Sequence, residues 1–265
     1  MPGAEAMPFL MKPLLDAMAN APFPGRCLGC GQLFRRQPRA KDDGSKKPGA
    51  DRVLADYFCP ACSGQWTPVT SPLCSRCGMV FKSRTGTDHI CGRCLEYPGA
   101  FTRARAAGVY DGTLRIAIQA LKFRGHTRLA NPLGTLLYET YRRYWPVGDI
   151  DLIAPVPLHR RRFRRRGFNQ AFLLVNGWPL PGEAVLVRDL LTRSRSTPPQ
   201  TGLDRRQRRI NIKNAFGVSR SGESAGKRVL LVDDVLTTGA TAEACATILL
   251  KDGAKQVDVL TLARA

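Results

Sequence analysis

The sequence of 265 residues contains no uninterrupted run of about 18 apolar residues, the length that a membrane-spanning helix needs. Its amino terminus also lacks the pattern of a secretory signal. The apolar stretch at residues 9–15 is interrupted by Lys12 and Pro13, and no clear small-residue cleavage site follows. The sequence therefore predicts a protein without a membrane span, and we expect it to be cytoplasmic.

Acidic residues are scarce relative to basic ones. The chain has 41 lysines and arginines against 21 aspartates and glutamates, which gives a formal net charge of +20. A protein with such an excess is attracted to polyanions at long range. The charge alone does not distinguish DNA, RNA, anionic lipid and phosphorylated metabolites as partners.

The sequence contains neither GxxxxGKS nor GxxxxGKT, which disfavours a P-loop site for ATP. A different phosphate signal is present in VLLVDDVLTTGAT, at residues 229–241. Residues 229–232 predict a buried strand with Asp233 and Asp234 at its carboxyl end, where open α/β sheets place ligands. The loop that follows opens a helix, whose free N–H groups and dipole favour phosphate. A ribose phosphate fits because its hydroxyls donate to the two acids.

Strands and helices alternate from about residue 101 onward, which predicts a parallel α/β sheet flanked by helices. Residues 193–214 differ, because they are rich in Arg, Ser, Thr and Pro, and a loop of that length in a compact domain is usually functional. The predicted strands are residues 105–110, 150–156, 184–187, 229–232 and 257–262, and the predicted helices are residues 114–123, 128–144, 168–175 and 241–250.

Eight of the nine cysteines form four CxxC pairs, a spacing that places two thiolates on one tetrahedral metal. We expect structural zinc, because this region is too poor in apolar residues to fold alone. A short helix at residues 8–20 is predicted to precede the first pair, and an interleaved pairing stays open. Sequential pairing predicts one site from Cys27, Cys30, Cys59 and Cys62 and a second from Cys74, Cys77, Cys91 and Cys94. The ninth, Cys245, is expected to be a small buried residue.

Several strings together resemble the ComF/GntX family, a phosphoribosyltransferase-like group linked to natural competence. PVPLHRRRFRRRGFNQA, PPQTGLDRRQRRINIKNAF and VLLVDDVLTTGAT occur in that order, after LKFRGHTRLA and the CxxC pairs. The resemblance covers nearly the whole chain. It implies a zinc-binding module at residues 1–100, a type I phosphoribosyltransferase-like domain at residues 101–265, and a role in handling incoming single-stranded DNA. It supplies no settled reaction.

The resemblance implies 5-phosphoribosyl-1-pyrophosphate (PRPP) as the ligand, accompanied by Mg²⁺. Asp233 and Asp234 would contact the ribose. The 5-phosphate would lie against Thr237, Thr238, Gly239, Ala240 and Thr241. The pyrophosphate would lie against the loop after residues 150–156, with Val156, Pro157, Arg160, Arg161 and Arg162 as its candidates. Arginine suits this role because it makes bidentate contacts with phosphate groups.

The remaining arginines are dense enough to indicate a nucleic-acid partner, with Phe163 and Phe168 available to stack on bases. The candidates are Arg164, Arg165, Arg166, Arg205, Arg206, Arg208 and Arg209. The alternative is that some bind the phosphates of PRPP and others are only solvated.

Three functions follow from these features. The favoured one is a DNA-handling adaptor that uses PRPP as a ligand or has kept only the fold, with proteins of the DNA-uptake machinery as candidate partners. The alternatives are an Mg²⁺-dependent phosphoribosyltransferase of unknown acceptor, for which no catalytic nucleophile is identified, and a PRPP-sensing regulator.

Overall fold

The computed structural model describes residues 24–36, 53–83, 85–180, 182–194 and 215–265. The helix predicted at residues 8–20 lies outside these residues. So do four candidate nucleic-acid contacts, namely Arg205, Arg206, Arg208 and Arg209.

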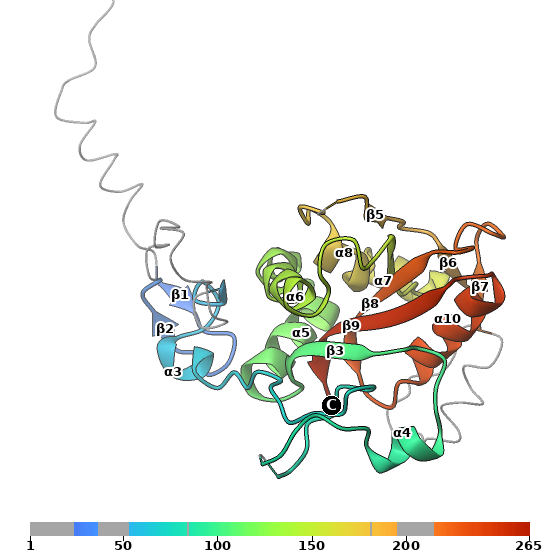
Figure 1. Cartoon of the computed structure of the whole chain (residues 1–265). Coiled ribbons are helices and arrows are strands. Elements are labelled where there is room, and N and C mark those ends of the chain that lie inside the picture. Colours follow the sequence, from blue (N-terminus) through green and yellow to red (C-terminus); the bar gives the residue numbers. More distant parts are fainter. Residues whose placement is uncertain (1–23, 37–52, 84, 181, 195–214) are drawn as a thin grey trace, which may run out of the picture.

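A five-stranded parallel sheet forms the centre of the molecule, with the strand order β3-β9-β8-β4-β5 (Figure 1). The central strands β8 and β9 are the longest, at nine residues each. This sheet confirms the predicted parallel α/β fold. The strands are β3 (Ala104–Val109), β4 (Leu152–Pro155), β5 (Val185–Leu186), β8 (Arg228–Leu236) and β9 (Gln256–Arg264).

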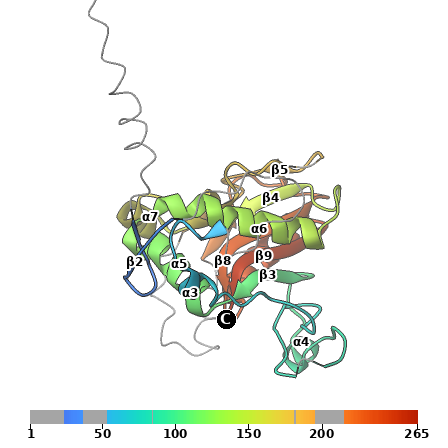
Figure 2. The ribbon, with the colours of Figure 1, turned by 90° about the vertical axis from the view of Figure 1, so that its left-hand side faces the viewer.

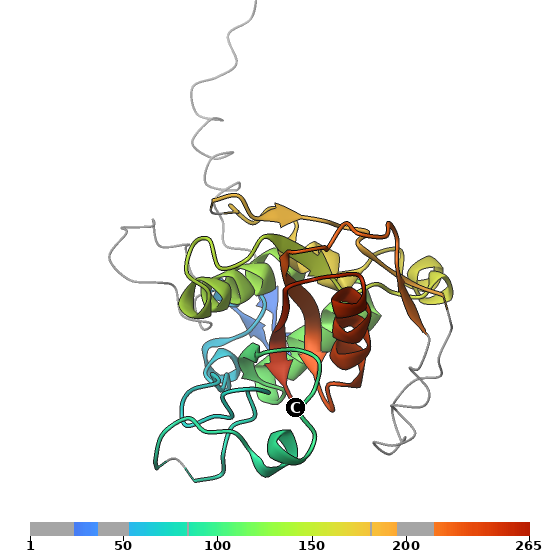
Figure 3. The same cartoon turned by 45° about the vertical axis from the view of Figure 1, so that its right-hand side comes forward.

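Helices cover both faces of the sheet, and the side chains of β8 alternate between the two cores that result. Leu230 and Val232 pack with α5 and α6, whereas Val229 and Leu231 pack with α10. Figures 1 and 3 show α5 and α6 on one face and α10 on the other. The helices of this part are α5 (Gly112–Arg124), η1 (Thr127–Leu129), α6 (Ala130–Tyr144), α7 (Arg160–Arg166), α8 (Gln170–Val175) and α10 (Ala240–Lys251).

Strand β8 continues beyond the end that the sequence predicts at residue 232. It pairs with β9 through Asp233 opposite Thr261 and through Leu236 opposite Arg264. The hydrogen bonds to β9 keep the strand regular, so the polar pair does not end it. Because neighbouring residues of a strand point to opposite faces, the two aspartates diverge instead of forming one adjacent pair.

Residues 160–166, for which no element is predicted, form α7. The Nδ1 atom of His159 accepts a hydrogen bond from the backbone N–H of Arg161 at 3.2 Å and caps the start of the helix. Gly167 ends it with a φ of +83°, a left-handed conformation that glycine adopts readily. A second unpredicted element is the antiparallel pair β6 (Leu191–Arg193) and β7 (Phe216–Val218).

The cysteine-rich part folds as two small units that contact different sides of the sheet domain. Figures 1 and 2 show the first unit beside α5 and α6, and α4 apart from it, near the carboxyl terminus. Their elements are β1 (Gly25–Arg26), β2 (Leu33–Phe34), α3 (Pro60–Ser63) and α4 (Gly92–Glu96). The domain boundary at residue 100 stays a prediction. Among the described residues, no helix has the length and apolar character that a membrane crossing requires.

Candidate phosphate site and cysteine clusters

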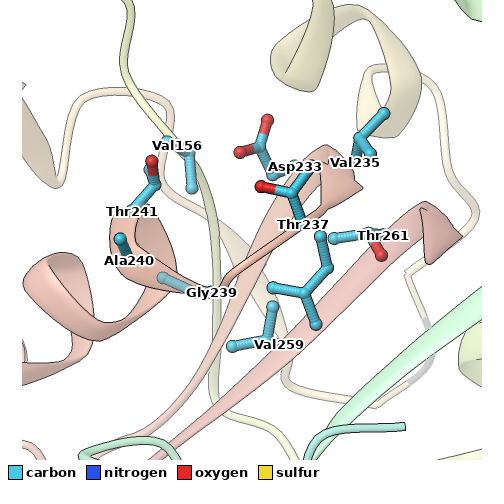
Figure 4. Close-up of a pocket in the computed structure, with 11 residues that line it drawn as sticks. Val156, Asp233, Val235, Thr237, Gly239, Ala240, Thr241, Val259 and Thr261 are labelled. Carbon is cyan, nitrogen blue, oxygen red and sulfur yellow. The ribbon is translucent and has the colours of Figure 1, made fainter. Parts of the chain in front are cut away.

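A small pocket lies at the carboxyl end of β8 and contains much of the predicted phosphate loop. Figure 4 shows the side chains of Asp233, Thr237 and Thr241 around the same hollow, with Val156 beside Thr241. Val156 is held there because its N–H donates to the carbonyl of Val232 at 2.8 Å. The structure therefore brings together the ends of β4 and β8, the two segments in which the sequence predicts pyrophosphate and phosphate contacts.

The loop between β8 and α10 suits an anion. Gly239 has a φ of +83°, which strains any residue with a side chain, so the backbone conformation selects glycine here. The hydroxyl of Thr238 accepts a hydrogen bond from the N–H of Ala240 at 3.4 Å, at the point where α10 begins. The free N–H groups and the positive end of the dipole of this 12-residue helix favour negative charge at the same place.

The two aspartates have different surroundings. Asp233 lines the pocket, whereas Asp234 is 3% exposed and forms an ion pair with Lys122 of α5, at 2.6 Å between Nζ and Oδ2. Burial raises the pKa of Asp233 to about 6, against the opposing effects of Lys122 and two arginines. Burial also lowers the pKa of Lys122 to about 8. Of the two carboxylates, that of Asp233 faces the space that a ligand would occupy.

A group of cations lies near Asp233. Lys122 is joined by Arg162 and Arg166 from α7 and by Arg193 from β6, and burial lowers the pKa of each arginine. Arg193 is 9% exposed, and its guanidinium lies over the ring of Phe216. Arg166 donates to the side-chain oxygen of Gln170. The charges of Lys122, Arg193 and Arg166 favour the ionised carboxylate of Asp233, so this end of β8 is favourable for negative charge.

Helix α7 divides its arginines between two faces. Arg162 and Arg166 are one turn apart and half-buried, and the charge of Asp233 acts on Arg166. The outward arginines are Arg160, Arg161, Arg164 and Arg165, all of them exposed. Phe163 is 39% exposed and, with Leu158, Arg160 and Arg164, lines a shallow hollow of about 390 Å³. The outer face of α7 therefore combines positive charge with an accessible aromatic ring.

These positions refine the sequence-based assignments without testing their ligands. Val156 lines the pocket and Arg162 is half-buried on α7, whereas Arg160 and Arg161 are exposed. Arg166, assigned from the sequence to nucleic acid, faces inward.

Lys122 and Arg193 belong to the cluster but were not predicted. A usable signal existed for Lys122. It follows Ile118 by four residues and so extends the buried stripe of α5, where a lysine requires a partner.

The cysteines group as the sequential pairing predicts. In each of the two groups the four sulfur atoms lie within 4.8 Å of one another, and the groups are Cys27, Cys30, Cys59 and Cys62, and Cys74, Cys77, Cys91 and Cys94. The Sγ atoms of Cys30 and Cys59 are 3.8 Å apart, and those of Cys77 and Cys91 are 3.9 Å apart. Zinc–sulfur bonds of about 2.3 Å in a tetrahedron place the sulfurs about 3.8 Å apart, so both groups fit zinc.

Backbone N–H groups point at one sulfur in each cluster. Cys27 accepts from Gly29 and Cys59, and Cys74 accepts from Cys77 and Cys91, all at 3.4 Å. Burial raises the pKa of both thiols, but these bonds outweigh it and lower the pKa of Cys27 to about 6 and of Cys74 to about 7. Such bonds stabilise thiolates, the form that binds metal.

Comparisons with known proteins agree with this architecture. The phosphoribosyl transferase domain model matches residues 183–265, and the double zinc ribbon domain model matches residues 49–95. The chain is 35% identical over 210 residues to DNA utilization protein YhgH of Escherichia coli O157:H7, covering 78% of this chain and 90% of that one. It is 34% identical over 224 residues to competence protein F of Haemophilus influenzae, covering 79% and 98%. Competence protein ComFC of Bacillus subtilis is 27% identical over 79% of this chain and 85% of its own length.

Proposed function

Because the chain belongs to the ComF family of competence and DNA utilization proteins, we propose that it binds PRPP with Mg²⁺ and handles single-stranded DNA during the use of incoming DNA. The observation that carries the PRPP part is the pocket lined by Asp233, Thr237, Gly239, Ala240 and Thr241, together with the charges of Lys122, Arg193 and Arg166 on Asp233. We place this role in the cytoplasm, where reduced thiols are available to bind zinc.

The pocket offers a partner for each group of PRPP. The 5-phosphate accepts from the N–H groups at the start of α10 and from Thr237 and Thr241. The ribose hydroxyls donate to Asp233. The pyrophosphate lies toward Arg162 and Arg166, the two half-buried arginines of α7, because arginine makes bidentate contacts with phosphate groups.

Mg²⁺ fits this arrangement as a companion of the pyrophosphate. It prefers oxygen ligands, binds through one or two carboxylates, and completes its shell with phosphate oxygens and water. Asp233 supplies the carboxylate that faces the pocket, whereas Lys122 holds Asp234. When bound, the ion offsets negative charge on the phosphates.

The outer face of α7 carries the DNA part of the proposal. Exposed arginines neutralise phosphates, and the accessible ring of Phe163 stacks on a base. This surface lies on the same short helix as the inward arginines, so one element serves both ligands. Proteins of the DNA-uptake machinery are candidate partners of the complex.

Fluorescence anisotropy with a labelled single-stranded oligonucleotide tests the DNA part. The double variant Arg160→Ala/Arg164→Ala should weaken binding at least about tenfold and flatten its dependence on salt. The control Arg142→Ala/Arg143→Ala removes the same charge from the exposed end of α6 and should change affinity less than about threefold. An equal loss of DNA affinity in both variants would show that only the total positive charge matters, which would contradict the proposal.

The transferase alternative has its own assay. Pyrophosphate release from PRPP in the presence of nucleobases, amines or single-stranded DNA would establish a reaction. Saturable PRPP binding without release on any of these acceptors supports a binding role.

A further inference from the structure

The second cysteine cluster lies against the phosphate loop. Arg93, on α4 between the ligands Cys91 and Cys94, extends its guanidinium to the loop and donates from Nη2 to the carbonyl of Thr238 at 2.6 Å. The same nitrogen is the nearest atom, at 3.6 Å, to a Cβ placed on Gly239. This contact joins residues 145 positions apart in the chain.

A second arginine reaches the loop from β9. Arg264 is 6% exposed, and its Nη1 donates to the carbonyls of Leu236 at 2.9 Å and Thr237 at 2.7 Å, as well as to that of Ala265. Two guanidiniums thus hold three successive carbonyls, from residue 236 to residue 238. Hydrogen bonds from charged donors are about twice as strong as neutral ones, so these contacts fix the loop more firmly than a usual turn.

The thiols of the cluster border the same arginine. Burial lowers the pKa of the Arg264 guanidinium, and the negative charge of Cys77 and a hydrogen bond to that thiol partly oppose this effect. Four thiolates around Zn²⁺ carry a net charge of −2, which favours a cation beside the cluster. Metal on the cluster therefore stabilises Arg264 in the position from which it holds the loop.

The cluster is also fixed to the sheet, which lets it act as an anchor. The N–H of Ala104, at the start of β3, donates to the carbonyl of Arg76 at 2.6 Å. Arg105 donates to the carbonyl of Ser75 at 2.9 Å. Gly78 lies so close to the carbonyl of Ala104 that a Cβ would approach it to 2.6 Å. A shift of the ribbon relative to β3 would break these contacts.

We propose that the second cysteine cluster positions the phosphate loop through Arg93 and Arg264, so that metal on the cluster and phosphate in the loop stabilise each other. This inference rests on the proposed function, since the ligand of the loop is PRPP there. The coupling is reciprocal by thermodynamic necessity. Zinc strengthens PRPP binding, and PRPP slows the loss of zinc from Cys74, Cys77, Cys91 and Cys94.

The first cluster provides a matched control within the same chain. Its Arg26 also donates to a backbone carbonyl, from Nε to Gly31 at 3.0 Å, but both groups belong to the first unit. No hydrogen bond between described residues joins that unit to residues 236–239. Arg26→Gln therefore removes a ribbon arginine without touching the loop.

The test compares Arg93→Gln with Arg26→Gln in the full chain, after zinc content shows two ions per chain in both. Arg93→Gln should speed hydrogen exchange at residues 238–241 about tenfold and weaken PRPP binding about tenfold, and Arg26→Gln should change neither. PRPP should also slow zinc transfer to a chromogenic chelator in the wild type, with a smaller effect in Arg93→Gln.

Unchanged exchange at residues 238–241 in Arg93→Gln overturns the inference, whether or not PRPP binds. Arg93 is the decisive position because it is only partly buried, whereas replacing the buried Arg264 risks misfolding. If the wild type fails to bind PRPP, the proposed function fails, and the exchange measurement still decides whether the ribbon positions the loop.

Discussion

The two cysteine clusters have the same ligands and the same CxxC spacing but opposite surroundings. In the first, Cys30 is exposed, and Cys27 and Cys62 join the core on the α5 and α6 face. In the second, all four cysteines are buried and pack mainly with one another. Two clusters with the same ligands therefore occupy different structural positions. The first extends a hydrophobic core, and the second borders the candidate site.

Helix α5 connects the first cluster to the candidate site. Its first turn carries Thr113, whose hydroxyl donates to the carbonyl of Cys62. Its last turn carries Lys122, which pairs with Asp234. The first cluster is thus separated from the pocket by the length of a helix, whereas the second reaches it through single side chains.

Removing one thiol from each cluster gives the largest expected effect. Cys77→Ser should release the second zinc, an interaction worth about 10–16 kcal/mol in small zinc modules, and abolish PRPP binding with it. Cys30→Ser should weaken the first zinc but leave PRPP affinity within about threefold of the wild type. Zinc stoichiometry and calorimetry measure both. Equal loss of PRPP binding in the two variants would erase the functional difference between the clusters.

Lys122→Met tests whether the α5 side also supports the pocket. It leaves the carboxylate of Asp234 buried without its partner, a change that costs about 3–5 kcal/mol of unfolding free energy. Urea unfolding measures this cost, and Lys122→Met/Asp234→Leu should recover most of it. If the single variant is as stable as the wild type, the ion pair does not anchor β8 to α5.

Thr113→Val probes the first cluster alone. Losing the hydroxyl leaves the carbonyl of Cys62 without this donor and should cost about 1–3 kcal/mol of stability. The first zinc should dissociate faster, with no change in PRPP affinity. A fall in PRPP affinity as large as that of Arg93→Gln would show that both clusters act on the loop.

The pH dependence of PRPP binding gives the smallest effect and isolates Asp233. The pKa of its carboxyl is about 6 in the folded protein, so it protonates as the pH falls below that value and no longer accepts two hydroxyl hydrogen bonds. Between pH 6 and pH 5, the PRPP affinity of the wild type should fall up to about tenfold more than that of Asp233→Asn. The variant serves as the control because the ligand's phosphates titrate equally in both measurements. Parallel pH profiles in the two proteins would remove Asp233 from the ribose contact.

Local patterns were sufficient to predict much of this architecture. The CxxC spacing predicted the sequential metal groups. The β8–α10 pocket was predicted from an apolar strand that is followed by two acids and a Thr/Gly loop. Both signals lie within short segments, where backbone geometry follows from a few residues.

Other features depend on contacts between distant segments and had no local signal. Strand β8 extends past residue 232 because β9 pairs with it, and α7 consists almost entirely of arginines, so it shows no hydrophobic periodicity. Arg93 and Arg264 acquire their positions only when the ribbon packs against the loop. From the sequence alone they are two among many arginines.

The central claim is that the pocket of Asp233 and Thr237–Thr241 binds PRPP. Calorimetric titration of PRPP with Mg²⁺ tests it most directly, with Asp149→Asn as a control that removes a carboxylate from a surface ion pair. We predict one saturable site per chain, weakened at least about tenfold by Asp233→Asn and unchanged by Asp149→Asn. No saturable binding by the wild type, or equal binding by the two variants, would contradict the account.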